Sequence, residues 1–171
     1  MQQNGNADMI LIGLGANLPG PLGSPRQTLE AALLRLEELG LRLRALSRFW
    51  KTRPVPVSDQ PWFVNAVAAV ETTLPPAELL QLLHRVEDEF GRVRSVVNAP
   101  RLIDLDLLAY GRLILAEPDG PIVPHPRLGE RAFVLLPLRD MAAAWIHPVT
   151  GEGLAPMIAR LPADQDVIPL A

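Results

Sequence analysis

The chain contains no cysteine, a single lysine and no apolar run long enough to cross a membrane. The missing thiols exclude thiolate catalysis and zinc–thiolate sites. Residues 1–8 are polar and lack the basic flank and apolar core of a signal peptide, so we expect a cytoplasmic protein with no membrane partner. The formal net charge of −3 is not that of a nucleic-acid-binding surface, which leaves any anion site to local clusters among the 15 arginines.

The length and composition indicate one folded unit. A chain of 171 residues with 49% hydrophobic side chains can bury about two-thirds of its unfolded surface. We expect a flexible N-terminal tail over residues 1–8 and a single domain over 9–171. The 18 prolines fall singly or in pairs at expected turns rather than in a low-complexity tract, which favours a rigid domain with short loops.

The hydrophobic periodicity predicts an alternation of strands and helices. Strands are expected at 9–15, 41–50, 63–73 and 103–110, and helices at 25–39, at 75 or 76 to 90, and at about 155–161. Ser24 and Pro25 form a plausible cap and first turn for the first long helix, and Gly91 stops the second. The order strand, helix, strand, strand, helix, strand is typical of a ferredoxin-like sandwich. We therefore expect an α+β fold with an antiparallel sheet and both long helices packed on one of its faces.

The most informative segment is 91–108, which combines three arginines with an Asp-x-Asp pair. Side chains two apart on a strand project to the same face, so Asp104 and Asp106 converge while residues 103, 105 and 107 point into a core. Paired carboxylates are hard oxygen ligands suited to Mg²⁺, and arginine forks upstream can neutralise phosphate oxygens. The alternative is a solvated edge strand whose aspartates face water. The arginines and the Ala-Pro turn favour a metal–polyphosphate site.

Other residues are less specific. Asn65 interrupts a buried apolar run and must find polar partners, which a ligand could provide. A phenylalanine in an apolar strand is more often a core residue than a ligand platform. The run Glu87-Asp88-Glu89 is most simply a solvated helix end, although Glu87 could brace an arginine. His84 and His147 are interpreted as structural.

Five short motifs, in this order, resemble the hydroxymethyl-dihydropterin pyrophosphokinase family of folate biosynthesis. They are GLGANL at 13–18, DQP at 59–61 with FVNA at 63–66, GRVR at 91–94, NAPR at 98–101 with DLDLL at 104–108, and VPHP at 123–126 with RAFVL at 131–135. The resemblance runs from residue 10 to about 145, and in it residues 13–17 form a structural turn. The chain departs from the family at Val97, where an arginine is common, and at Asp119-Gly120, where a basic residue is common.

The resemblance implies transfer of the β,γ-pyrophosphoryl unit of ATP to the hydroxymethyl group of a reduced pterin, with release of AMP. Its partners are therefore ATP and a reduced pterin, with other folate-pathway enzymes as further candidates. It implies that two Mg²⁺ ions are held by Asp104 and Asp106, and that these two residues are catalytic together with Arg92 and Arg101. The implied ATP contacts are Arg92, Arg94, Asn98, Arg101, Leu107, His125 and Arg131. The implied pterin contacts are Thr52, Val55, Phe63, Asn65, Asp104 and Phe133.

Two other classes of protein stay open from the residues alone. A non-catalytic ferredoxin-like module would bind a small ligand or a protein and ignore Mg²⁺ and ATP. A metal-dependent nucleotidyl or sugar transferase would also use Asp-x-Asp, but such enzymes usually need a larger nucleotide domain than this chain provides.

Overall fold

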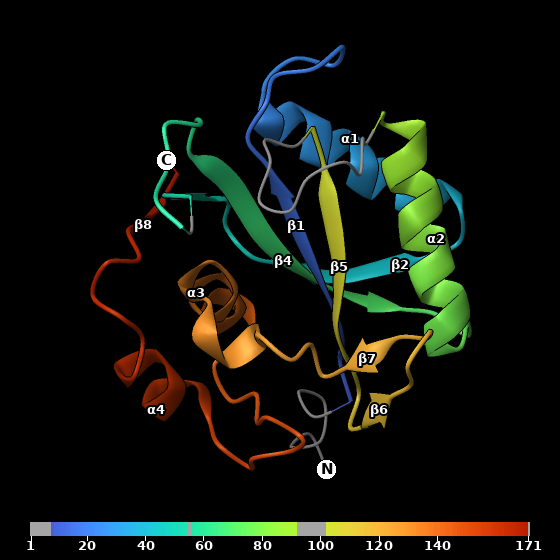
Figure 1. The fold of residues 1–171 in the computed structure, drawn as a ribbon. Coiled ribbons are helices and arrows are strands. Elements are labelled where there is room, and N and C mark those ends of the chain that lie inside the picture. The colour runs from blue at the N-terminus through green and yellow to red at the C-terminus, as the bar shows by residue number, and fades with distance from the viewer. Residues whose placement is uncertain (1–7, 55, 92–101, 171) are drawn as a thin grey trace.

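The fold is a mixed α+β arrangement around one antiparallel sheet (Figure 1). The computed structural model describes residues 8–54, 56–91 and 102–170. The sheet contains β1 (Ile10–Ala16), β2 (Arg42–Leu46), β3 (Trp50–Thr52), β4 (Phe63–Glu71), β5 (Asp104–Tyr110) and β8 (Val167–Pro169). Its order is β5-β1-β4-β3-β8, and β2 also pairs with β4. A separate hairpin joins β6 (Leu115–Ala116) to β7 (Ile122–Val123).

Two helices cover one face of the sheet, as expected. Helix α1 (Pro25–Glu38) begins at a capping box in which Ser24 Oγ accepts from the Gln27 N–H at 3.2 Å and Gln27 Oε1 accepts from the Ser24 N–H at 2.9 Å. Helix α2 (Pro76–Glu89) starts with proline at its first position. Both helices pack leucines against alternate residues of β1 and β4, such as Ile12 and Ala68.

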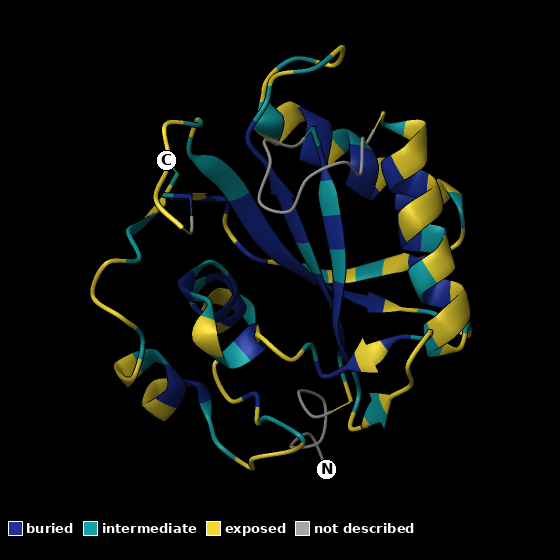
Figure 2. Ribbon diagram, in the orientation of Figure 1, coloured by how far each residue is buried: buried dark blue, intermediate teal, exposed yellow. Residues whose placement is uncertain are grey.

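The opposite face is also covered, which the sequence did not predict. Helix α3 (Ala132–Met141) lies over it, with the short helix α4 (Leu154–Ala159) and a 3-10 turn (Leu128–Glu130) beside it. A second apolar cluster joins α3 to the strand residues that point away from α1 and α2, such as Leu11 and Val67. The molecule therefore has helices on both sides of the sheet (Figure 1), and the central strands are buried throughout much of their length (Figure 2).

Several predicted boundaries differ from the structure. The strand expected over 41–50 is two strands, because the β2–β4 register shifts between Leu43 and Ala45 and Ser47 then leaves the ladder to bind Val67. Residues 13–15 belong to β1, as the strand expected over 9–15 requires, and the structural turn that the resemblance implied for 13–17 begins only after Ala16. The tail expected over residues 1–8 lies almost wholly outside the described residues. Within the described ranges, no helix combines the length and apolar character needed to cross a membrane.

Candidate functional site

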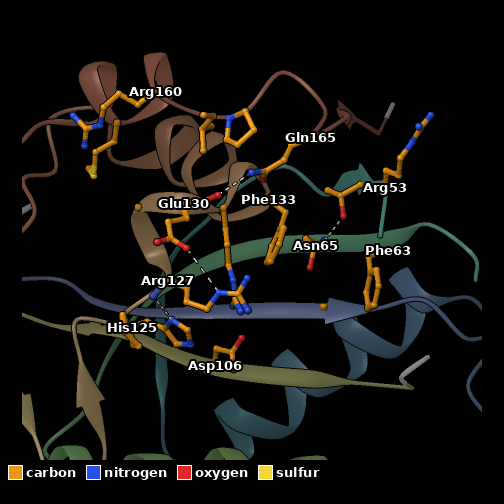
Figure 3. Close-up of a pocket in the computed structure, with 18 of the residues that line it drawn as sticks. Arg53, Phe63, Asn65, Asp106, His125, Arg127, Glu130, Phe133, Arg160 and Gln165 are labelled. Atoms are coloured by element: carbon orange, nitrogen blue, oxygen red, sulfur yellow. Dashed lines mark hydrogen bonds and ion pairs between the residues drawn. The ribbon is translucent and has the colours of Figure 1, made fainter. Parts of the chain in front are cut away.

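A cavity of about 840 Å³ opens at one end of the sheet face that α3 covers (Figure 3). Its wall comes from β1, β3, β4, β5, the 3-10 turn, the start of α3 and the C-terminal segment. The lining residues that the sequence had singled out are Thr52, Phe63, Asn65, Asp104, Asp106, His125, Arg131 and Phe133. Segments far apart in the chain therefore supply one site.

Strand β1 forms the floor of this cavity and fixes the register of its neighbours. Gly15 pairs with Asn65 on one side and with Asp104 on the other, so these three positions form one row across the sheet. A Cβ atom at Gly15 would lie 2.5 Å from Asn65 Oδ1. Glycine is thus required at position 15, because only a residue without a side chain lets the Asn65 amide approach β1 so closely.

The two aspartates project from β5 into the cavity. Asp104 and Asp106 are half-buried, while Ile103, Leu105 and Leu107 are buried on the other face. This confirms the alternation expected from the sequence. Two half-exposed carboxylates on one strand face suit Mg²⁺, which keeps several waters and shares its coordination with substrate phosphates. Among the described residues no group of three or more His, Cys, Asp or Glu side chains could hold a metal by itself.

The start of β5 is held by a carboxylate from the opposite side of the sheet. Glu87, in the last turn of α2, is fully buried, and its Oε2 accepts a hydrogen bond from the Leu105 N–H at 2.8 Å. The interpretation of Glu87 as part of a solvated helix end was wrong. Its carboxylate instead fixes the backbone between Asp104 and Asp106.

The aromatic side of the cavity contains two phenylalanines and one amide. Figure 3 shows the Phe133 ring coming from α3 and the Phe63 ring from β4, with Asn65 drawn between them. The buried Asn65 donates from Nδ2 to Thr52 Oγ1 at 2.6 Å. Part of the hydrogen-bonding capacity of Asn65 is therefore used inside the protein, and Thr52 and Asn65 together present one polar unit beside the rings.

A third part of the cavity wall contains His125 and Arg131. Burial of the His125 ring, together with the nearby Arg131 and Arg127 charges, lowers its pKa from 6.5 to about 4. Its Nδ1 accepts from the Arg127 N–H at 3.1 Å, which leaves the proton of the neutral ring on Nε2. The Arg131 guanidinium lies 5.3 Å from the centre of the Phe133 ring. At neutral pH the site thus contains an uncharged imidazole donor beside a permanent cation.

Six of the residues highlighted in the sequence lie outside the described residues: Val55, Arg92, Arg94, Val97, Asn98 and Arg101. Leu107, unlike the candidate site residues that line the cavity, does not face it. Its side chain is buried in the core under α1 and α2 and does not line the cavity. Its expected contact with ATP stays a prediction, and it would have to be made by the backbone.

The cavity wall also includes residues that sequence reasoning had not assigned to a site, among them Gly15, Arg53, Gln60, Arg127, His147 and Gln165. Gly15 could have been found, because a glycine inside a strand often marks a place where another group approaches the backbone closely. The others come from turns and from the C-terminal segment, and no local pattern in the sequence distinguishes them.

The fold and the cavity together define an α+β protein with a small-ligand site built from carboxylates, cationic groups and aromatic rings. A profile of the 7,8-dihydro-6-hydroxymethylpterin-pyrophosphokinase (HPPK) family matches residues 11–143. The chain is 41% identical over 154 residues to the 2-amino-4-hydroxy-6-hydroxymethyldihydropteridine pyrophosphokinase of Pseudomonas aeruginosa, covering 90% of this chain and 91% of that protein. It is 40% identical over 138 residues to the Haemophilus influenzae protein of the same name, covering 80% and 83%. The chain therefore belongs to the HPPK family.

Longer proteins also contain a region similar to this chain. The "Folic acid synthesis protein fol1" of Pneumocystis carinii is 37% identical over 163 residues, which is 95% of this chain but only 21% of that protein. The crystal structure of Plasmodium falciparum HPPK-DHPS superposes with a TM-score of 0.69 at 14% identity, covering 89% of this chain and 44% of that one. This structural similarity shows the fold. The chain spans less than half of either of these longer proteins.

Proposed function

We propose that this chain transfers the pyrophosphoryl group of ATP to the hydroxymethyl group of 6-hydroxymethyl-7,8-dihydropterin, with release of AMP, in folate biosynthesis. The family membership supports this activity. The observation that carries the proposal is that Asp104 and Asp106 line the same cavity as the Thr52–Asn65 pair and the two phenylalanines. An anion-handling side and an aromatic side thus share one enclosed space.

In this proposal the pterin lies between the Phe63 and Phe133 rings. A flat heteroaromatic ring gains from offset contact with both faces. The hydrogen-bonding edge of the pterin lies against the Thr52–Asn65 pair. This pair favours a ligand that can both donate and accept hydrogen bonds. Such pairing gives specificity because a ligand without the matching groups would leave buried polar atoms unpartnered.

The triphosphate would lie along β5, toward His125 and Arg131. Arg131 supplies a fixed positive charge, and His125 Nε2–H supplies a neutral donor. Arg92 and Arg101 are proposed to contact the phosphates as well, with Arg94 and Asn98 as further ATP contacts, although these four lie outside the described residues. The substrate hydroxyl attacks the β-phosphorus and loses its proton to solvent, and AMP leaves with the bridging oxygen. The protein contributes mainly by holding the two substrates in line and by neutralising charge.

Two Mg²⁺ ions are proposed as cofactors, held by Asp104 and Asp106. Bound Mg²⁺ would neutralise the triphosphate and make the attacking hydroxyl more acidic. The residues fit this role, because two carboxylates that share a strand face provide hard oxygen ligands beside a cavity open to phosphates.

The proposal has three broader parts, which concern the core of the fold, the cellular location and association with other enzymes. The strand order β5-β1-β4-β2 supports a ferredoxin-like core within one domain over 9–171. A cytoplasmic location is expected from the sequence. Association with other folate-pathway enzymes is supported by relatives such as the "Folate synthesis bifunctional protein, mitochondrial" of Arabidopsis thaliana, of which this chain covers 23%.

The test is to incubate the protein with ATP, Mg²⁺ and hydroxymethyl-dihydropterin and to identify the nucleotide product. We expect AMP in a one-to-one ratio with pterin pyrophosphate, no AMP after EDTA treatment, and recovery when Mg²⁺ is restored. Formation of ADP would contradict pyrophosphoryl transfer. Activity that persists in EDTA would contradict the metal assignment alone.

A further inference from the structure

Helix α3 begins without a cap from its own sequence. Its N-cap residue is Arg131, whose side chain makes no capping hydrogen bond. Arginine is not among the residues that cap helices well, and no Ser, Thr, Asp or Asn stands in its place. The helix nevertheless carries Phe133 in its first turn, and Phe133 is part of the cavity wall. The first turn of α3 therefore needs support from elsewhere in the chain.

That support comes from Gln165, 33 residues downstream of the helix start. Gln165 Oε1 accepts a hydrogen bond from the Ala132 N–H at 2.8 Å. Gln165 Nε2 donates to the Glu130 carbonyl oxygen at 2.9 Å (Figure 3). Because one partner can only donate and the other can only accept, the amide has a single satisfactory orientation. The two bonds lie on either side of Arg131 and immediately before Phe133.

The segment that carries Gln165 is fastened to the other wall of the cavity. The Arg53 N–H donates to the Asp166 carbonyl oxygen at 3.0 Å, and the Arg53 guanidinium pairs with the Asp166 carboxylate at 3.0 Å. Strand β8 then pairs with β3, so that Val167 lies opposite Thr52. Gln165 therefore links the α3 wall, which carries Phe133, to the strand wall, which carries Thr52 and Asn65.

We propose that Gln165 is a positioning residue that sets the distance between the Phe133 ring and the Thr52–Asn65 pair, and so the width of the slot for a flat heteroaromatic ligand. Gln165 lies beyond residues 11–143, the part of the chain that the family profile matches. The identity of the ligand as a reduced pterin rests on the proposed function. The link between the two walls does not, because its contacts are all within the protein.

The experiment compares three variants in the full chain. Gln165→Leu removes both hydrogen bonds at similar volume, and Gln165→Glu keeps an acceptor for the Ala132 N–H but cannot donate to the Glu130 carbonyl. Asp166→Asn is the matched control, since it removes the ion pair to Arg53 but retains the backbone contact and the Gln165 amide. Hydrogen–deuterium exchange of the free protein reports on residues 130–136, with 63–71 of β4 as the internal reference.

We expect Gln165→Leu to speed exchange at 130–136 about tenfold, the effect of losing two neutral hydrogen bonds, with exchange in β4 unchanged. Pterin affinity, measured with a non-hydrolysable ATP analogue present, should weaken by a similar factor, while affinity for the analogue alone should fall by a smaller factor, because Arg131 is only one of several proposed phosphate contacts. Gln165→Glu should recover part of both losses. Unchanged exchange at 130–136 would overturn the proposal, and so would a uniform rise across the sheet or an equal effect of Asp166→Asn.

The outcome can be separated from a failure of the proposed function. If the parental protein releases no AMP, the exchange data still decide whether Gln165 fixes the start of α3. If AMP is released but the pterin affinity of Gln165→Leu equals that of the parent, the activity stands and the positioning role is wrong.

Discussion

The two faces of the central sheet differ in how far their apolar surface extends. Under α1 and α2, the strands present buried aliphatic residues from Ile10 to Leu14 in β1 and from Ala66 to Val70 in β4. Under α3, the apolar cluster covers only one end of the face, where Leu11, Val67 and Ala69 lie. At the other end β1 presents glycine, β4 presents Phe63 and Asn65, and β5 presents the two aspartates.

This difference shows how one sheet can be both a scaffold and a site. The α1–α2 face supplies packing and thus stability, because its apolar surface is continuous. On the α3 face, the end of the sheet near the start of α3 is not covered by the apolar cluster, and the cavity lies there. Substitutions at the cavity end of the α3 face should therefore lower turnover with little effect on stability. Substitutions on the α1–α2 face should lower stability with little effect on turnover.

The largest effect should come from the aspartates of the α3 face. Asp104→Asn and Asp106→Asn should each lower turnover by roughly a thousandfold, because a neutral amide oxygen lacks the negative charge of the carboxylate and binds Mg²⁺ much more weakly. The unfolding midpoint should stay near that of the parent. Steady-state AMP release and thermal melts measure the two quantities, with Asp119→Asn, an exposed acid outside the cavity, as the control. Near-parental turnover at saturating Mg²⁺ would refute the metal assignment.

The complementary change lies on the α1–α2 face. Leu79 in α2 is fully buried, and Leu79→Ala should lower the free energy of unfolding by about 2–5 kcal/mol through lost transfer energy and a cavity. Turnover at a temperature where the variant is folded should change less than twofold. Urea unfolding and steady-state kinetics decide the matter. A large loss of turnover in fully folded protein would show that the α1–α2 face also determines activity.

A smaller effect is expected at Asn65, which lies on the α3 face and is hydrogen-bonded to Thr52. Asn65→Ala removes the partner of Thr52 and should weaken pterin binding by about 1–3 kcal/mol. Binding of the ATP analogue without pterin should be little changed, and calorimetric titrations of both ligands measure this. Equal losses for both would indicate a folding defect instead.

The smallest effect concerns pH. The folded pKa of His125 is lowered from 6.5 to about 4, so between these values the unfolded chain binds a proton that the folded protein does not. Its stabilising contribution is complete above pH 6.5 and declines as the pH falls toward 4. From pH 7 to 5 the loss should be roughly 1 kcal/mol, allowing for the partial exposure of the ring.

His125→Asn should flatten this pH dependence, because asparagine can still accept from the Arg127 N–H but does not titrate. Urea unfolding at several pH values measures the slopes. Equal slopes in the parent and His125→Asn would show that another group is responsible.

The sequence predicted the parts of this architecture that depend on local patterns. Alternation placed Asp104 and Asp106 on one strand face, and helical periodicity with a Ser-Pro start located α1. Helix α3 was missed because its apolar residues run together around Pro137 and because its capping partner, Gln165, is distant in sequence. Helical periodicity places Glu87 on the side of α2 nearer the core, but its partner could not be predicted, since it is a backbone amide of β5.

The acidic run Glu87-Asp88-Glu89 at the end of α2 limits which surface charges of this protein can be redesigned. Glu89 forms bidentate contacts with Arg35 of α1, at 2.8 and 3.1 Å, and the neighbouring Glu87 carboxylate supports the β5 backbone between the two aspartates. A surface-charge redesign that treated residues 87–89 as one solvent-facing group would therefore alter the candidate site from the far side of the sheet. Solubility mutagenesis of this helix should therefore retain both Glu87 and Glu89.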